Sequence, residues 1–232
     1  MGPFSMKHND KVNCLVDVAR ALRFLHDVGI THGDIKAENI LVFTLDLNIR
    51  QYVGLTRYFI AKVTDFGCAH ISDGKHARLP GGTPTWSAPE AKELMSSDLL
   101  SKTDIYSYGL LVTSVMLEQD LYSCFDLSGD RHEQRQSLEV LKRNSTLLEH
   151  AERAVRSKNV LKKDLDNTVQ VLHHTLLLDP QSRSLEHVED FFQPRHGEIQ
   201  RGKSRSKKLL ASKIPPLYDI DELSLVSTVP PS

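Results

Sequence analysis

Residues 31–42 read Thr-His-Gly-Asp-Ile-Lys-Ala-Glu-Asn-Ile-Leu-Val, and this stretch decides the fold of the 232-residue chain. It carries a carboxylate at Asp34, an ammonium at Lys36 and a carboxamide at Asn39, directly before the apolar run 40–43. Such groups suit phosphoryl transfer, which needs a base for a hydroxyl, a cation for the phosphate charge and an oxygen ligand for magnesium. The alternative interpretation is a polar turn that only leads into a strand.

Composition favours a soluble, intracellular protein. The hydrophobic share of 40% and the charged share of 25% are ordinary for a globular domain. A net charge of -1 gives no overall attraction to nucleic acid or to an anionic membrane. Cys14, Cys68 and Cys124 are too far apart in sequence to indicate a zinc site or a disulfide framework, which favours a reducing compartment. No apolar run is long enough to cross a bilayer, so we expect a cytoplasmic location.

The spacing of apolar residues predicts a mainly helical fold with a small β-hairpin. Residues 10–28 follow a 3.6-residue rhythm, with Asn9 or Asp10 as the cap and Gly29 at the end. Residues 40–43 and 57–64 read as two strands, and residues 68–85 as a long irregular segment. The connection 46–56 gives no clear signal.

Further helices are expected in the second half of the chain. Residues 104–117 are apolar on nearly every side, which is typical of a buried helix. A short helical stretch over 88–94 and two amphipathic helices over 133–157 and 160–178 complete the prediction. The domain is expected to cover residues 1–194. The remainder, 195–232, is a basic and largely disordered tail, which leaves a nuclear location open as well.

Five ordered motifs resemble those of the eukaryotic protein kinases. His32–Asn39 is similar to the catalytic loop H-R-D-L-K-x-x-N, and Asp65–Gly67 matches D-F-G. Ala88–Glu90 matches A-P-E. Asp104–Gly109 resembles the start of the family's central helix, and Asp179–Arg183 resembles the D-P-x-x-R near its end. The resemblance implies an ATP- and Mg²⁺-dependent transferase that phosphorylates protein substrates.

The resemblance assigns a chemical role to each matching polar position. Asp34 would orient the substrate hydroxyl as the catalytic base, a role typically worth about 10²–10⁴ in rate. Lys36 would steady the transferring phosphate of ATP. Asn39 and Asp65 would hold Mg²⁺, which prefers oxygen donors. Leu41 would contact the adenine from below.

Structural roles are implied for other matching residues. His32 and Phe66 would pack in the spine that links the two lobes of the kinase fold. Glu90 and Arg183 would form a buried ion pair, and breaking such a pair typically costs about 3–5 kcal/mol. Asp104 would anchor the catalytic loop from the central helix. The full set of structural positions is His32, Phe66, Gly67, Thr83, Glu90, Asp104 and Arg183.

The loop also indicates a specificity class. Lys36, two places after the base, resembles the serine/threonine type, and so does Gly82-Thr83-Pro84-Thr85-Trp86 before A-P-E. The resemblance implies that Thr83 would hydrogen-bond toward Asp34 and Lys36. Gly33 stands where most kinases have arginine, the usual partner of a phosphorylated activation segment. We therefore expect independence from that phosphorylation. His-Gly-Asp also resembles small-molecule phosphotransferases, which lack A-P-E and are the less favoured alternative.

One part of the kinase pattern is not found in the sequence. No G-x-G-x-x-G loop and no strand lysine precede His32, although both belong to the small β-rich lobe that covers ATP. The chain is therefore expected to represent the C-terminal lobe alone, with the N-lobe absent and with other domains of a longer parent protein as partners. The alternative is a truncated, pseudokinase-like scaffold that binds partners without catalysis.

Overall fold

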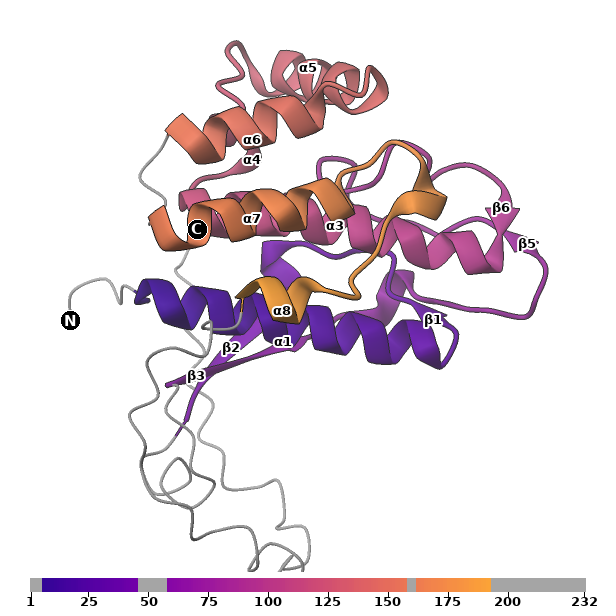
Figure 1. Cartoon of the computed structure of the whole chain (residues 1–232). Coiled ribbons are helices and arrows are strands. Elements are labelled where there is room, and N and C mark those ends of the chain that lie inside the picture. The colour runs from indigo at the N-terminus through magenta and orange to yellow at the C-terminus, as the bar shows by residue number, and fades with distance from the viewer. Residues whose placement is uncertain (1–5, 46–57, 158–161, 193–232) are drawn as a thin grey trace, which may run out of the picture. The chain divides into compact units, whose positions relative to one another are not determined.

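Helix α3 (Ser97–Leu117) runs through the centre of the fold in the computed structural model, which describes residues 6–45, 58–157 and 162–192 (Figure 1). All residues from Thr103 to Thr113 are buried, so every face of this helix segment meets another part of the protein. The buried helix predicted from the apolar run is confirmed, although it begins earlier than expected, at Ser97.

Helix α1 (His8–Asp27) packs against α3 and carries the chain to the polar loop. Its helical rhythm was predicted correctly, but the predicted cap was wrong. The N-cap residue is Lys7, whereas Asp10 lies buried in the first turn. Gly29 follows the C-cap with φ 75°, a left-handed conformation that glycine adopts without steric cost. The chain turns there into the short strand β1 (Ile30–Thr31).

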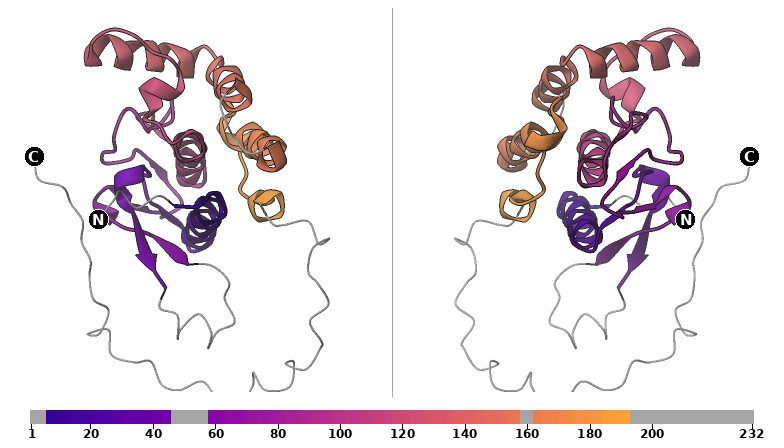
Figure 2. Two further views of the ribbon diagram at one scale, coloured as in Figure 1. Left: turned by 90° about the vertical axis from the view of Figure 1, so that its left-hand side faces the viewer. Right: turned by 90° about the vertical axis from the view of Figure 1, so that its right-hand side faces the viewer.

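The predicted hairpin forms from β2 (Ile40–Thr44) and β3 (Phe59–Val63), which pair antiparallel. β3 also lies against α1, where the Ala61 amide donates a hydrogen bond to Oδ2 of Asp17 at 3.0 Å. In the turned views of Figure 2, the hairpin lies on one side of α1 and α3, while α7 (Lys162–Thr175) and α8 (Val188–Phe192) lie on the other. The connection 46–56 lies outside the described residues.

Two further strand pairs were missed by the sequence prediction. β1 pairs with β4 (His70–Ile71), and β5 (His76–Ala77) pairs with β6 (Met95–Ser96). Each strand has two residues, too few for a periodic signal in the sequence. These pairs tie the first half of the segment predicted as irregular to the rest of the domain.

The remaining helices differ from the prediction at their boundaries. The single helix expected over 133–157 is two helices, α5 (Arg131–Arg143) and α6 (Leu147–Ser157), separated by Ser145 at φ 61°. The short helix expected over 88–94 is wrong, because that segment forms turns. α7 ends at Thr175, before the expected stop. A short helix α4 (Leu121–Cys124) follows α3.

The described residues are thus mainly helical with small antiparallel sheets, as predicted, and they belong to one compact unit, Met1–Gln193. Among them, no helix combines the length and apolar character needed to span a membrane. The tail predicted from residue 195 lies outside the described residues.

A buried ion pair connects the turns after residue 87 to the last part of the domain. The Arg183 guanidinium donates to both carboxylate oxygens of Glu90, at 2.5 and 3.1 Å, and stacks over the ring of Tyr106 at 4.7 Å. Its remaining N–H groups bond the carbonyls of Lys102, Leu177 and Leu178. A buried arginine with this many partners is compensated for its loss of hydration.

Candidate active site

The loop predicted to carry the chemistry is fixed at its start by Asp104 of helix α3. The backbone amides of His32 and Gly33 donate to the two carboxylate oxygens of Asp104, at 2.7 and 2.8 Å. His26 Nε2 lies 3.0 Å from the same carboxylate. Asp104 is only 1% exposed, and a buried carboxylate is tolerated only when it is hydrogen-bonded. The buried helix therefore sets the backbone of the loop.

His32 links the loop to the Asp65-Phe66-Gly67 segment. Its Nε2 lies 2.9 Å from the Thr64 carbonyl, which can only accept, so Nε2 carries the proton. Nδ1 is then free to accept from the Asp34 amide at 3.3 Å. The ring also meets that of Phe66 edge to face, with centroids 5.0 Å apart. A single imidazole tautomer thus satisfies both neighbours.

The Asp34 carboxylate lies at the centre of a hydrogen-bond network. Lys36 Nζ donates to Oδ2 at 2.7 Å, and the Thr83 amide donates to Oδ1 at 2.8 Å. Asn39 Nδ2 donates to the Asp34 carbonyl at 2.8 Å and to Oδ2 at 3.1 Å. Burial alone would raise the pKa of Asp34, but the bonds from Lys36 and Thr83 outweigh it and lower the pKa. The carboxylate is therefore ionised at neutral pH and can accept a proton or orient a hydroxyl.

Lys36 joins the loop to the segment that precedes Ala88-Pro89-Glu90. Its ammonium bonds Asp34 and also Oγ1 of Thr83, at 2.8 Å. The hydrogen bond to Asp34 raises the pKa of Lys36, burial lowers it, and the nearby charges of Asp34, Glu38 and Asp65 raise it further. The group remains a cation beside these three carboxylates, in a position to attract a phosphate.

Asn39 and Asp65 are brought together by the β2–β3 pair. The Thr64 amide donates to the Asn39 carbonyl at 3.0 Å, which sets Asp65 just beyond the paired strands. Asp65 is exposed, has φ 64° and accepts from the Gly67 amide at 3.2 Å. Asn39 uses its amide nitrogen toward Asp34, so its carboxamide oxygen is the atom suited to a cation.

These donors suit a Mg²⁺ ion that also binds substrate phosphates and water, rather than a metal ion whose ligands all come from the protein. The described residues contain no group of three or more His, Cys, Asp or Glu side chains that could hold a metal ion. Mg²⁺ usually keeps several waters and takes only one or two carboxylates together with substrate phosphates. One exposed carboxylate and one carboxamide oxygen, placed at the same end of the β2–β3 pair, are enough for that requirement.

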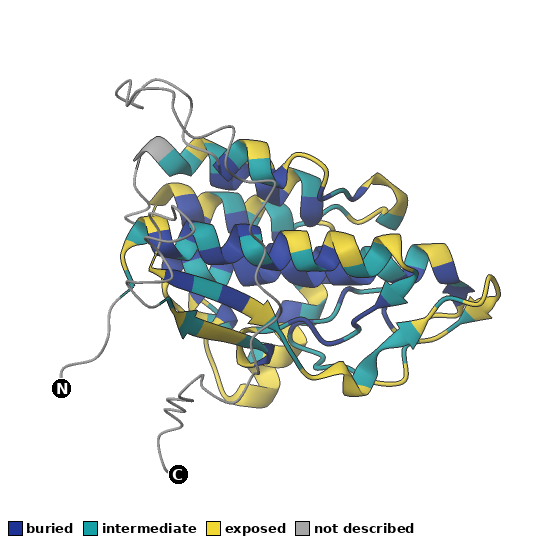
Figure 3. Cartoon of the chain, turned by 90° about the horizontal axis from the view of Figure 1, so that it is seen from below, coloured by how far each residue is buried: buried dark blue, intermediate teal, exposed yellow. Residues whose placement is uncertain are grey.

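Apolar side chains are exposed next to these polar groups. Leu41 and Val42 of β2 are 46% and 44% exposed, and Phe66 is 49% exposed. Figure 3 shows the side of the molecule on which the hairpin lies, where β2 carries exposed and intermediate residues and β3 carries buried ones as well. An apolar surface of this kind commonly marks a site for a ligand or for another protein segment.

Two glycines allow the loop and the segment after Asp65 to touch through their backbones. A Cβ on Gly33, which has φ 81°, would lie 2.4 Å from the Cys68 carbonyl oxygen. A Cβ on Gly82, at φ 123°, would lie 2.7 Å from the Gly33 carbonyl oxygen. The sequence drew attention to the arginine missing at position 33 but not to this packing. In the sequence, the Gly81-Gly82 pair was the only sign of this close backbone packing.

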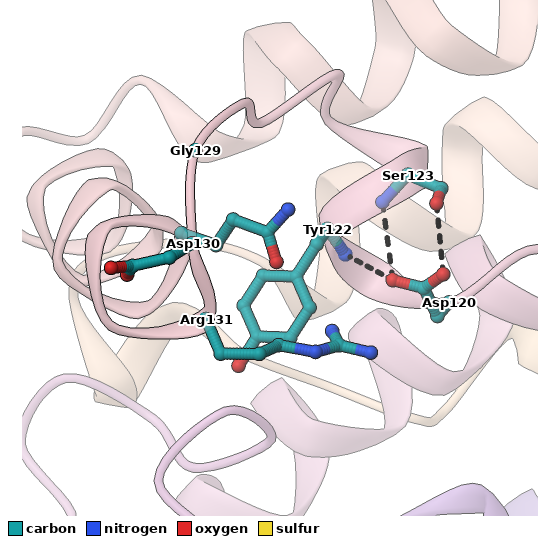
Figure 4. Close-up of a pocket in the computed structure, with 7 residues that line it drawn as sticks. Asp120, Tyr122, Ser123, Gly129, Asp130 and Arg131 are labelled. Atoms are coloured by element: carbon teal, nitrogen blue, oxygen red, sulfur yellow. Dashed lines mark hydrogen bonds between the residues drawn. The ribbon is translucent and has the colours of Figure 1, made fainter.

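The hollow shown in Figure 4 does not belong to this site. It has a volume of about 400 Å³ and is lined by residues of α4, α5 and their connection: Asp120, Tyr122, Ser123, Gly129, Asp130, Arg131 and Gln134. Both of its carboxylates are occupied by helix capping. Asp120 accepts from the first amides of α4, and Asp130 forms a capping box with Glu133 at the start of α5. These acids therefore serve the fold.

Comparison with known proteins places the chain in a family. The model of the protein kinase domain matches residues 3–189, so the chain belongs to the protein kinase domain family. It is 34% identical over 110 residues to the dual specificity protein kinase shkD of Dictyostelium discoideum, covering 46% of this chain and 13% of that protein.

Two other relatives match the same share of this chain. The chain is 36% identical over 115 residues to a probable receptor-like protein kinase of Arabidopsis thaliana, covering 46% of this chain and 15% of the relative. It is 32% identical over 111 residues to the serine/threonine-protein kinase mos of Gallus gallus, covering 46% and 28%. The chain thus matches less than a third of the length of each of these relatives.

The backbone contact at Gly33 leads to a stability prediction. We expect Gly33→Ala to lower the free energy of unfolding by about 1–3 kcal/mol more than Gly74→Ala does. Both substitutions strain a left-handed backbone, but only at position 33 does the new Cβ collide with the Cys68 carbonyl. Gly74→Ala is the matched control, since Gly74 has φ 78° and nothing within 4 Å of an added Cβ. Urea unfolding of both variants measures the difference, and equal losses would contradict the contact.

Proposed function

We propose that this chain carries the catalytic loop of a protein kinase that transfers the γ-phosphate of ATP to serine or threonine hydroxyls of protein substrates. The observation that carries the proposal is the Asp34 carboxylate, which is held on three sides by Lys36, Thr83 and Asn39. The network needs no further rearrangement to present an ionised acid and a cation side by side.

Each residue has a defined task in this proposal. Asp34 accepts or orients the proton of the incoming hydroxyl, and Lys36 attracts the transferring phosphate. Asn39 and Asp65 hold Mg²⁺, which neutralises phosphate charge when bound. The exposed Leu41 side chain contacts the adenine ring. Because Thr83 is bonded to both Asp34 and Lys36, it keeps base and cation at a constant separation.

The serine/threonine class is supported by the contact between Lys36 and Thr83. This bond joins the loop to Gly82-Thr83-Pro84, the stretch that resembles serine/threonine kinases. The buried ion pair between Glu90 and Arg183 supports a protein kinase over a small-molecule phosphotransferase, which lacks the A-P-E motif. The identity of the protein substrate is not part of the proposal.

We further propose that a β-rich small lobe covers the exposed surface of Leu41, Val42 and Phe66, supplied by other residues or by another polypeptide. The described residues include three two-stranded sheets, and their strands are not arranged as such a lobe. The same apolar surface also supports a second candidate function, a scaffold that binds a partner there without ATP. Binding of Mg²⁺ and ATP distinguishes the two candidates.

Independence from activation-segment phosphorylation is supported by the packing of Gly33. In this chain the place of an arginine is taken by a direct backbone contact with Cys68, and Thr83 is already bonded to Asp34. The segment is therefore held by the backbone contact at Gly33 and by the bonds of Thr83 to Asp34 and Lys36, without a phosphate to complete it.

Phosphatase treatment tests that independence. The active full-length protein should keep its rate of peptide phosphorylation after complete dephosphorylation, which mass spectrometry of residues 69–87 verifies. Ser72→Ala serves as a second check, because the hydroxyl at this position is then lost permanently. A rate that falls on dephosphorylation and returns when phosphate is restored at Ser72 or Thr85 would contradict this part of the proposal.

Removal of the base tests the proposed activity itself. Phosphotransfer from ATP to a serine/threonine peptide by the full-length protein should fall about 10²–10⁴-fold in Asp34→Asn, because the amide cannot accept the proton. Asp73→Asn is the control, since Asp73 is an exposed acid paired with Lys75 outside the network. Equal activity of Asp34→Asn and wild type would refute the assignment of the base.

A further inference from the structure

Helix α5 carries a buried cation that the catalytic network does not use. Lys142 is 1% exposed, and its ammonium donates to the carbonyls of Pro84, Thr85 and Ser87 at 2.8, 3.0 and 2.9 Å. Glu139, one turn earlier on α5, lies 3.3 Å away. The donors of one side chain thus converge on a single four-residue segment from a distant part of the sequence.

The energetic cost of this arrangement indicates a specific role. Burial lowers the pKa of Lys142 to about 8, and the charge of Glu139 opposes that shift only in part. An apolar side chain could fill the same position on α5 without the cost of removing an ammonium from water. What an apolar side chain could not do is bond three backbone carbonyls. Lysine at position 142 therefore differs from an apolar residue in that it binds the backbone of residues 84–87.

The segment held by Lys142 continues directly from the candidate base. Thr83 donates its amide to Asp34 and accepts from Lys36. The amides of Trp86 and Ser87 then bond back to the Thr83 carbonyl, at 2.9 and 3.0 Å, and Ser87 Oγ bonds the same carbonyl. Any displacement of residues 84–87 would consequently move Thr83 against the carboxylate.

A second group holds the same segment from α4. The Tyr122 hydroxyl lies 2.8 Å from Oγ1 of Thr85. The guanidinium of Arg131 lies over the Tyr122 ring, 4.9 Å from its centroid (Figure 4). Thr85 is thereby bonded to two helices, through its hydroxyl to Tyr122 of α4 and through its carbonyl to Lys142 of α5. Pro84, Thr85 and Ser87 remain partly exposed, so the outer side of the segment is available for contact.

We infer that Lys142 is a positioning residue for the protein substrate: it holds residues 84–87 as the surface on which the polypeptide chain beside the acceptor hydroxyl docks. The inference rests on the proposed kinase function, because the base beside Thr83 defines where that hydroxyl lies. Residues 84–87 follow Thr83 directly and are partly exposed, so they are the nearest accessible backbone beside a hydroxyl at Asp34. Lys142 acts through the backbone of the segment and does not contact ATP.

Hydrogen exchange of the full chain tests the hold of Lys142 without any need for activity. In Lys142→Met the carbonyls lose their donors, and we expect the amides of Trp86 and Ser87 to exchange about tenfold faster, with those of α3 unchanged. Arg143→Met is the matched control, because it removes an exposed charge from the same helix. Should Lys142→Met fail to fold, Lys142→Gln is measured instead: its shorter side chain has two N–H donors for three carbonyls, so the same amides should still exchange faster than in wild type.

Kinetics of the active full-length protein test the link to substrate. Lys142→Met should raise KM for a peptide about tenfold and leave KM for ATP unchanged, whereas Arg143→Met should change neither. Unchanged exchange of residues 85–87 in a folded variant, or an equal rise in both KM values, would overturn the inference. If wild type shows no phosphotransfer, the proposed function fails, while the exchange result still decides whether Lys142 holds the segment.

Discussion

The carboxylate of Asp104 accepts hydrogen bonds from two successive backbone amides of the catalytic loop while it is itself enclosed by the protein. A carboxylate in such a position is stable only if its partners remain in place, so the loop and helix α3 constrain each other. Helix α3 in turn is fixed by contacts on every side. The position of Asp34 therefore follows from the packing of the whole domain. The same logic applies to Arg183 and Lys142, whose buried charges each bind at least two backbone carbonyls of segments without regular structure.

These interactions explain how irregular segments can be held accurately beside a reactive group. The turns that contain Thr83 and Glu90 lack a helix or a long strand to define them. Their backbone is instead bonded by Asp34 and Lys142, while Arg183 holds the side chain of Glu90. At Gly33 and Gly82 two segments of the backbone approach more closely than any side chain would permit. A positioned network of this kind lowers the cost of reorganisation when charge develops during a reaction.

Much of the architecture could be predicted from the sequence because it depends on local periodicity. Helices α1 and α3 and the β2–β3 hairpin follow from apolar spacing, and the polar residues of the loop follow from their order in the chain. The break between α5 and α6 could not be predicted, because Ser145 adopts a left-handed conformation there and no glycine or proline marks the break in the sequence. The contacts of Lys142 and Tyr122 with residues 84–87 join positions far apart in sequence, and no local pattern marks them.

The most direct test of the account is calorimetric titration of the 232-residue chain with ATP in the presence of Mg²⁺ and, separately, of EDTA. If Asn39 and Asp65 form a metal–nucleotide site beside Asp34, wild type should bind ATP more tightly with Mg²⁺ than with EDTA, and Asp65→Ala should lose that difference. Affinity for ATP that is the same with and without Mg²⁺, or the same in wild type and Asp65→Ala, would contradict the account.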